Sequence, residues 1–215
     1  RDRKEAVLKV VAGSNGRDGR RRKAEPQFTP KYPTLPPCSP FPLPNAAWRR
    51  RHALGEEAAA RKAVKIRGAL DTTALERGLA IVLAQHDVLA AVVDLRNDEP
   101  WCVYKERSGI GIEHVYRQDL DSYAALKASQ EEIALRPWRL DQELARFYVL
   151  SIADDEHYLG VAIHPLIGDD AAASAVLGDF RAAYEVLLAG RSAKVSRRGI
   201  QLAEYYIGIH EALEL

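Results

Sequence analysis

The fold is decided by residues 136–191, which read RPWRLDQELARFYVLSIADDEHYLGVAIHPLIGDDAAASAVLGDFRAAYEVLLAGR. Two apolar runs, ARFYVLSIA and HYLGVAI, flank a DDE turn, and this arrangement predicts a β-hairpin. After the second run, Asp169 or Asp170 is expected to cap a long helix, because a carboxylate accepts hydrogen bonds from the first helical turn. Gly190 closes that helix. The stretch therefore predicts a hairpin that leads through a short loop into a helix.

The chain before this stretch alternates between strand and helix patterns. Strands are expected at residues 62–68, 88–95, 101–106 and 112–117. Helices are expected near residues 45–54, after a capping Asp71, from Asp119 to about Leu135, and from about Gly199 to the end of the chain. Alternating helices and strands with both hairpin and crossover connections predict a mixed α/β layer fold.

The composition excludes several classes of function. Lys plus Arg total 31 and Asp plus Glu total 30, so a net charge of +1 gives no field that attracts nucleic acid or an anionic membrane. The two cysteines, Cys38 and Cys102, lie outside any zinc-type spacing and favour a reducing, cytoplasmic setting. No apolar run reaches membrane-spanning length. The sequence therefore predicts a cytoplasmic protein with no metal, nucleic-acid or membrane partner.

The first forty residues differ from the rest. A charged, partly apolar segment, residues 1–12, is followed by a Gly- and Arg-rich stretch with nothing apolar to bury. Residues 26–44 then carry many prolines, which favour an extended strap. We expect residues 1–40 to form a tether or docking segment with a Pro-rich linker, and residues 41–215 to form the folded domain.

Four phrases, taken in order, resemble the sequence blocks of condensation domains from nonribosomal peptide synthetases. Within residues 136–191, RPWRLD stands where the family has a phrase like RPFDL, and a hairpin, a loop with the motif HHxxxDG and a helix ending near LLAGR follow. Upstream, SPFPLPNAAWRRRHAL and ALDTTALERGLAIVLAQHDVLAAVV resemble the opening block and the block that contains RHEALRTRF. Downstream, IQLAEYYIGIHEAL is similar to the QYADYALWQREWL helix. The resemblance covers about residue 41 to the end and indicates the N-terminal half of such a domain.

This resemblance implies an architecture and a set of partners. Condensation domains consist of two halves, each a two-layer sandwich similar to chloramphenicol acetyltransferase, which meet in a V-shaped cleft. Peptidyl or acyl carrier proteins dock at the two ends of the tunnel and deliver thioesters on phosphopantetheine arms. The expected partners are thus a carrier protein, the C-terminal half of the domain and neighbouring synthetase domains, with no cofactor bound directly.

The resemblance also assigns the reacting residues, and here the sequence departs from the family. An ungapped alignment places the first motif His on His164, the catalytic His on Pro165, the Asp on Asp169 and the Gly on Asp170. The family reaction is attack of an amine on a carrier-bound thioester, and an imidazole near the amine can take or position its proton. Proline has neither a titratable group nor a backbone N–H. The motif is therefore degenerate, and we expect catalysis to be impaired.

A second departure affects the same motif. In the family an arginine of the RHEALRTRF block holds the motif Asp in a salt bridge, and the two later arginine positions here are Ala90 and Val92. A buried carboxylate that has lost its cation is costly. We therefore expect Asp169 to be solvated, to cap a helix or to have another cation, and Asp170 to add a charge and restrict the turn.

Other interpretations remain open. One extra loop residue would make His164 the catalytic His, paired with Asp169 as HxxxxD. His164 can equally be a core histidine bonded to backbone, and Asp169 and Asp170 can be plain helix caps.

Three hypotheses for function follow from these alternatives. The first is an impaired condensation-like half that docks carriers or neighbouring domains. The second is an active acyl or peptidyl transferase that uses His164 and is completed by a second half-domain. The third is a structural relic that only supports a neighbouring domain.

Overall fold

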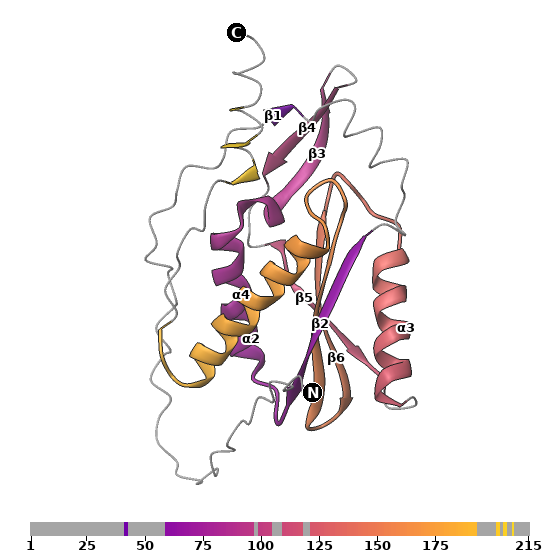
Figure 1. The fold of residues 1–215 in the computed structure, drawn as a ribbon, viewed down its shortest axis with the longest axis vertical. Helices are drawn as coiled ribbons and strands as arrows, with labels where there is room; N and C mark the ends of the chain where they lie inside the picture. Colours follow the sequence, from indigo (N-terminus) through magenta and orange to yellow (C-terminus); the bar gives the residue numbers. More distant parts are fainter. Residues whose placement is uncertain are drawn as a thin grey trace, which may run out of the picture.

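The computed structural model describes residues 41–42, 59–96, 99–104, 109–117 and 121–192, with positions 201, 202, 204, 205 and 208 (Figure 1). The strands are β1 (Phe41–Pro42), β2 (Ala60–Arg67), β3 (Ala91–Arg96), β4 (Glu99–Tyr104), β5 (Ile112–Tyr116), β6 (Ala145–Ala153) and β7 (Glu156–Ile163). The helices are α2 (Thr72–Gln85), α3 (Ser122–Leu135) and α4 (Asp170–Leu188), with a short 3₁₀ helix at Asp87–Ala90. The predicted mixed α/β fold is confirmed.

A four-stranded sheet with the order β2-β7-β6-β5 forms the centre of the fold. The predicted hairpin is its middle, with β6 antiparallel to β7 in a register that pairs Ala145 with Ile163 and Tyr148 with Gly160. Strand β2 adds antiparallel to β7, whereas β5 adds parallel to β6. The central strands are buried on both faces, which explains why ARFYVL is apolar at every position except Arg146.

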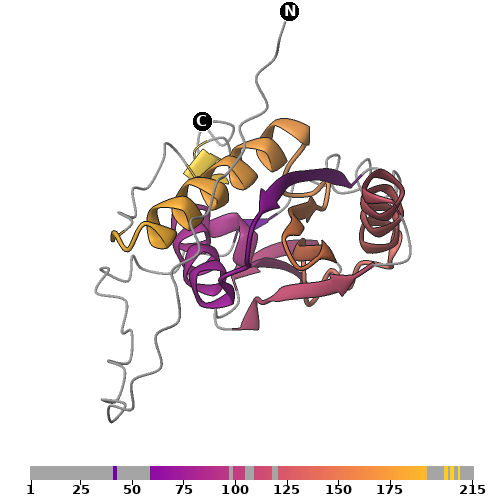
Figure 2. The ribbon, with the colours of Figure 1, turned by 90° about the horizontal axis from the view of Figure 1, so that it is seen from below.

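Helices cover both faces of this sheet (Figure 2). Helices α2 and α4 pack together on one face, where the larger core includes Leu75, Leu159, Phe147 and Phe180. Helix α3 lies on the other face, over a smaller cluster formed by Ala59, Ile133, Tyr148 and Ala162. Two layers of helices around one sheet satisfy the need of each apolar face for a partner.

Tyr148 and Gly160 fit together on the α3 side of the hairpin. A Cβ atom added at Gly160 would lie 2.0 Å from Cζ of Tyr148, so the ring occupies the space that any other residue would need. Burial raises the pKa of the Tyr148 phenol to about 12, which keeps the ring neutral. The close approach requires glycine at position 160.

The C-terminal end of α3 is held by a buried arginine from β6. The guanidinium of Arg146 donates to the carbonyl oxygens of Ile133 (2.6 Å), Arg136 (2.7 Å) and Pro137 (2.9 Å). Its Nε also donates to Glu143 Oε1 at 2.7 Å. The last carbonyls of a helix have no partners within the helix, so Arg146 satisfies them and neutralises the negative end of the helix dipole.

A second, small sheet with the order β1-β4-β3 extends beyond one end of the large sheet (Figure 1). The sequence predicted a strand over residues 88–95, but residues 87–90 form the 3₁₀ helix and β3 begins only at Ala91.

The N-cap of α2 is Asp71, as predicted, and its carboxylate accepts from the N–H of Ala74. The cap of α3 is Asp121 rather than the predicted Asp119.

Several predictions lie outside the described residues. These are the segments 1–40 and 45–54 and most of the C-terminal helix expected from Gly199. Within the described part of the chain, no helix is both long and apolar enough to cross a bilayer.

Replacement of Gly160 by alanine is expected to lower the free energy of unfolding by about 2–3 kcal/mol, because overpacked cores respond in this range. Urea denaturation measures the change. The matched control is Gly178→Ala on α4, where an added Cβ meets nothing within 4 Å. The free energy of unfolding of this variant is expected to rise by up to about 1 kcal/mol, because alanine has a higher helix propensity than glycine. Equal stability of Gly160→Ala and wild type would show that the ring does not occupy this space.

Replacement of Arg146 by methionine is expected to lower the free energy of unfolding by about 3–5 kcal/mol, because buried carbonyl groups and one carboxylate lose their donor. Arg146→Lys keeps the charge but not the planar set of donors, so its loss of stability should lie between zero and that of Arg146→Met. The control is Arg136→Met, since the pair of Arg136 with Glu113 is about half exposed (45% and 41%) and such pairs contribute about 0–1 kcal/mol. Similar losses for Arg146→Met and Arg136→Met, measured by chemical denaturation, would contradict this assignment.

Candidate functional site

The predicted motif lies on the loop from β7 to α4. The backbone of His164 anchors this loop at both polar groups. Its N–H donates to Leu144 O at 2.9 Å, and its C=O accepts from the N–H groups of Ile167 (3.0 Å) and Gly168 (3.3 Å). A Cβ at Gly168 would come within 2.8 Å of the Ala172 side chain, so the loop enters α4 tightly. The loop is therefore a closed turn and not an open arm.

The His164 side chain is buried, with 5% of its surface exposed. Its Nδ1 accepts a hydrogen bond from the N–H of Leu166 at 3.2 Å. An imidazole nitrogen that accepts from an N–H carries no proton, so in this geometry Nδ1 acts as an acceptor for the loop backbone. The edge of the ring meets Trp138 at a centroid distance of 5.4 Å and an interplanar angle of 74°. The predicted core histidine bonded to backbone is what the structure shows.

Pro165 is buried and begins the turn that closes on His164. The fixed φ of proline suits this position. No imidazole is available at position 165, so the only motif histidine is His164, whose Nδ1 lone pair is already used by the loop backbone.

Asp169 and Asp170 lie at the start of α4, in different roles. Asp169 is exposed and is the N-cap, accepting from the N–H of Ala172 at 2.9 Å. Asp170 is the first helical residue, so it does not restrict the turn as predicted. Its carboxylate pairs with Lys62 of β2 at 3.1 Å. Both charges face the positive end of the helix dipole, as the helix-cap interpretation predicted.

The two positions where the family carries arginines are buried and uncharged. Ala90 and Val92 are 3% and 4% exposed. Both line a cavity of about 580 Å³ whose other walls include Phe147 and Ile110. A carboxylate at Asp169 that caps a helix in an exposed position does not need a buried arginine.

Sequence reasoning missed the group that surrounds the motif loop. Arg146 stacks on Trp138, with the guanidinium carbon 3.8 Å from the ring centroid, and Trp138 in turn contacts His164. The signal was present in ARFYVL, where a lone arginine interrupts an apolar run. A charge in such a strand is buried only with partners, and its position relative to RPW could have suggested them.

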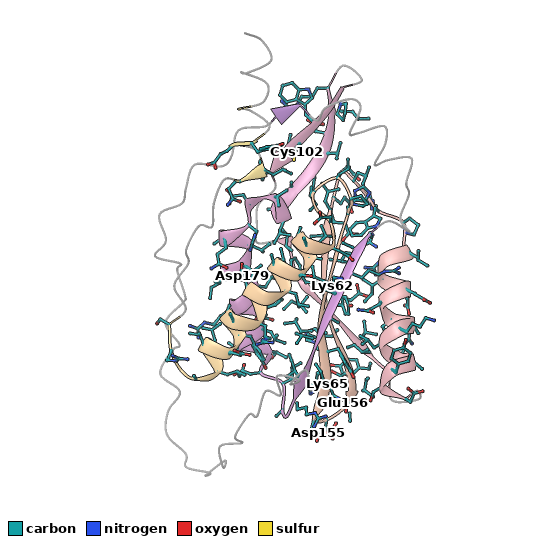
Figure 3. All side chains as sticks on the ribbon, in the orientation of Figure 1. Lys62, Lys65, Cys102, Asp155, Glu156 and Asp179 are labelled. Carbon is teal, nitrogen blue, oxygen red and sulfur yellow. The ribbon has the colours of Figure 1, made fainter. Side chains whose placement is uncertain are left out.

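A further ionisable cluster lies at the opposite end of β7 from the motif loop (Figure 3). Lys65 Nζ is 2.8 Å from Glu156 Oε1, and the Ser122 hydroxyl donates to the same oxygen. The hydrogen bond from Lys65 lowers the pKa of Glu156. The pair ties β2 to β7 and the start of α3, which is a structural role. Among the described residues, no group of three or more His, Cys, Asp or Glu side chains could hold a metal ion.

The hydrogen bond at Nδ1 limits the acid–base chemistry open to His164 as it lies in this structure. A general base needs a free lone pair within reach of the proton that it abstracts. At His164 the Nδ1 lone pair accepts from the N–H of Leu166. The site instead has the features of a well-packed structural turn.

Comparison with known sequences gives a family and several relatives. Residues 59–205 match the family model described as the condensation domain. The isonitrile lipopeptide synthase of Mycobacterium tuberculosis is 30% identical over 156 residues, which cover 70% of this chain and 6% of that protein. A linear gramicidin synthase of Brevibacillus parabrevis is 26% identical over 151 residues, covering 66% of this chain and 3% of that protein. The chain thus spans a small part of the curated relatives that it matches.

Solved structures confirm the fold. The X-domain from teicoplanin biosynthesis superposes with a TM-score of 0.67 and 24% identity, over 79% of this chain and 37% of that one. The starter condensation domain of the rhizomide synthetase RzmA gives a TM-score of 0.71 and 15% identity, over 81% of this chain and 46% of that one. The predicted acetyltransferase-like fold, which forms one half of a condensation domain, is therefore confirmed. By its sequence match over residues 59–205, the chain belongs to the condensation-domain family.

Proposed function

We propose that the chain is a condensation-domain-like part of a nonribosomal peptide synthetase, or of a hybrid peptide–polyketide synthetase, that docks carrier proteins or neighbouring domains and has little transfer activity. Its relatives include a lipopeptide synthase and a gramicidin synthase. A condensation domain that mediates chain release from the enacyloxin polyketide synthase has the same fold, with a TM-score of 0.59. The names of these proteins support a role within a multidomain synthetase.

The observation that carries the loss of activity is the state of the two motif positions. Position 165 is a proline, and the remaining histidine, His164, is buried with Nδ1 bonded to the Leu166 N–H. To act as a base, His164 would have to give up this bond or rotate against Trp138. Loss of a positioned acid–base group lowers rates by about 10²–10⁴-fold. We therefore expect little turnover compared with a domain whose motif is intact.

A docking role is supported by the integrity of the fold around the broken motif. Among the described residues, the sheet and its covering helices are in place, and Arg146 holds the end of α3 by hydrogen bonds. The imidazole that the family has at position 165 is missing. A related X-domain from teicoplanin biosynthesis has been solved in a complex with OxyB, at 22% identity and a TM-score of 0.67 over 94% of this chain. A fold of this kind can therefore serve as a binding surface. The expected ligand of that surface is a carrier protein with its phosphopantetheine arm.

The test combines a transfer assay and a binding assay on the 215-residue chain. Carrier proteins loaded with an acyl thioester and with an amine acceptor are mixed with wild type and with His164→Ala. We expect no product above background from either protein, and carrier binding, measured by calorimetry, that changes less than about twofold on substitution. A twofold change in affinity corresponds to about 0.4 kcal/mol.

Two results would contradict the proposal. Product formation that His164→Ala abolishes would show an active transferase that uses this imidazole. Absence of both product and carrier binding, with circular dichroism showing a folded protein, would show a structural relic. Pro165→Ala is the matched control, because it changes the same buried turn without removing an imidazole.

A further inference from the structure

A cavity of about 580 Å³ lies at the end of the sheet where β6 begins. Its volume falls within the range of about 300–1,000 Å³ that is usual for ligand sites in proteins. The floor consists of buried apolar residues, among them Leu89, Val92 and Phe147. Small residues keep the space open, since an added Cβ at Gly109 or Gly111 would meet nothing within 4 Å.

The rim of this cavity carries two ion pairs. Arg136 donates to both oxygens of Glu113 at 3.3 and 2.8 Å, and Glu143 accepts from the buried Arg146 at 2.7 Å. Each rim charge is thus neutralised by a neighbour. A ligand with a net charge would have to compete with these pairs, so the rim favours a neutral ligand.

The rim nevertheless keeps hydrogen-bonding capacity of both kinds. A guanidinium has five N–H donors, and Arg136 uses two of them on Glu113. Glu143 accepts through Oε1, which leaves Oε2 as an acceptor among the described contacts. The charge of Glu143 helps to raise the pKa of Arg136, after the larger effect of the hydrogen bond to Glu113, so the two groups lie within electrostatic reach of each other. A neighbouring donor and acceptor match the C=O and N–H of an amide.

The cavity also adjoins an open strand edge. Residues 109–111 lead directly into β5, and Glu113 of β5 lines the cavity. Among the strands that the structure describes, only β6 pairs with β5, and none lies against the outer edge of β5. Such an edge can accept an extended peptide by main-chain hydrogen bonds, with pockets receiving its side chains.

We propose that this cavity binds an extended, uncharged peptide segment of a partner polypeptide, with apolar side chains on the floor and a backbone amide between Arg136 and Glu143. The inference rests on the docking role proposed above and names a site and a chemistry for it. The site is separate from the motif, since His164, Pro165 and Asp169 do not line the cavity.

The experiment titrates the ¹⁵N-labelled 215-residue chain with a capped tripeptide, acetyl-Leu-Val-Leu-amide, and follows amide chemical shifts. Saturable shifts are expected at the amides of Gly109, Gly111 and Val92. Gly111→Phe should weaken binding at least about tenfold, which corresponds to about 1.4 kcal/mol. Gly178→Phe is the matched control, since Gly178 is equally unobstructed but lies outside the cavity, and should bind within about twofold of wild type.

The uncapped peptide Leu-Val-Leu tests the chemistry of the ligand, because its charged ends must compete with the rim ion pairs. Weaker binding of this peptide supports the proposal. Equal or tighter binding, unchanged affinity of Gly111→Phe, or no saturable shift at these amides would overturn it. Carrier binding is measured on the same proteins. If the carrier binds wild type while the capped peptide does not, the cavity inference fails and the docking role stands; if no carrier binds, the docking role fails by itself.

Discussion

The structure around the motif depends on the buried guanidinium of Arg146. A charge removed from water is strongly unfavourable unless hydrogen bonds replace its hydration, and here three backbone carbonyls and Glu143 do so. One of these carbonyls belongs to the end of α3, where the last carbonyls have no partners within the helix, and two belong to the RPW segment. One side chain from the central strand therefore joins the helix, the segment after it and, through Trp138, the motif loop.

The closed loop explains how the chain can keep the fold of its family after the motif has changed. The turn needs the backbone of His164, which bonds to Leu144, Ile167 and Gly168, more than it needs any catalytic group. Proline at position 165 suits such a turn, and Lys62 balances the added carboxylate of Asp170. Small, uncharged residues at positions 90 and 92 leave open space where longer side chains would extend. Each of these residues is accommodated by the packing of the fold.

The sequence predicted the elements whose signals are local. The β6–β7 hairpin followed from two apolar runs around DDE, and the starts of α2 and α4 followed from Asp71 and Asp169, because capping depends on neighbours three residues away. The sequence could not predict that β5 runs parallel to β6, that residues 87–90 form a 3₁₀ helix, or that the cavity exists, since these depend on contacts between distant segments. The burial of His164 and the hydrogen bond that its Nδ1 accepts from Leu166 also depend on how the loop packs in three dimensions.

The fit of Tyr148 over Gly160 has a consequence for how this family member can diverge. The two residues face each other across the hairpin, so a shift of the strands by one position would push the ring into Leu159 or Val161. The pair thus favours a single register of the two strands. The same register sets where β7 ends and the motif loop begins. A larger residue at 160 should therefore be tolerated better once the ring at 148 has been replaced by a smaller side chain.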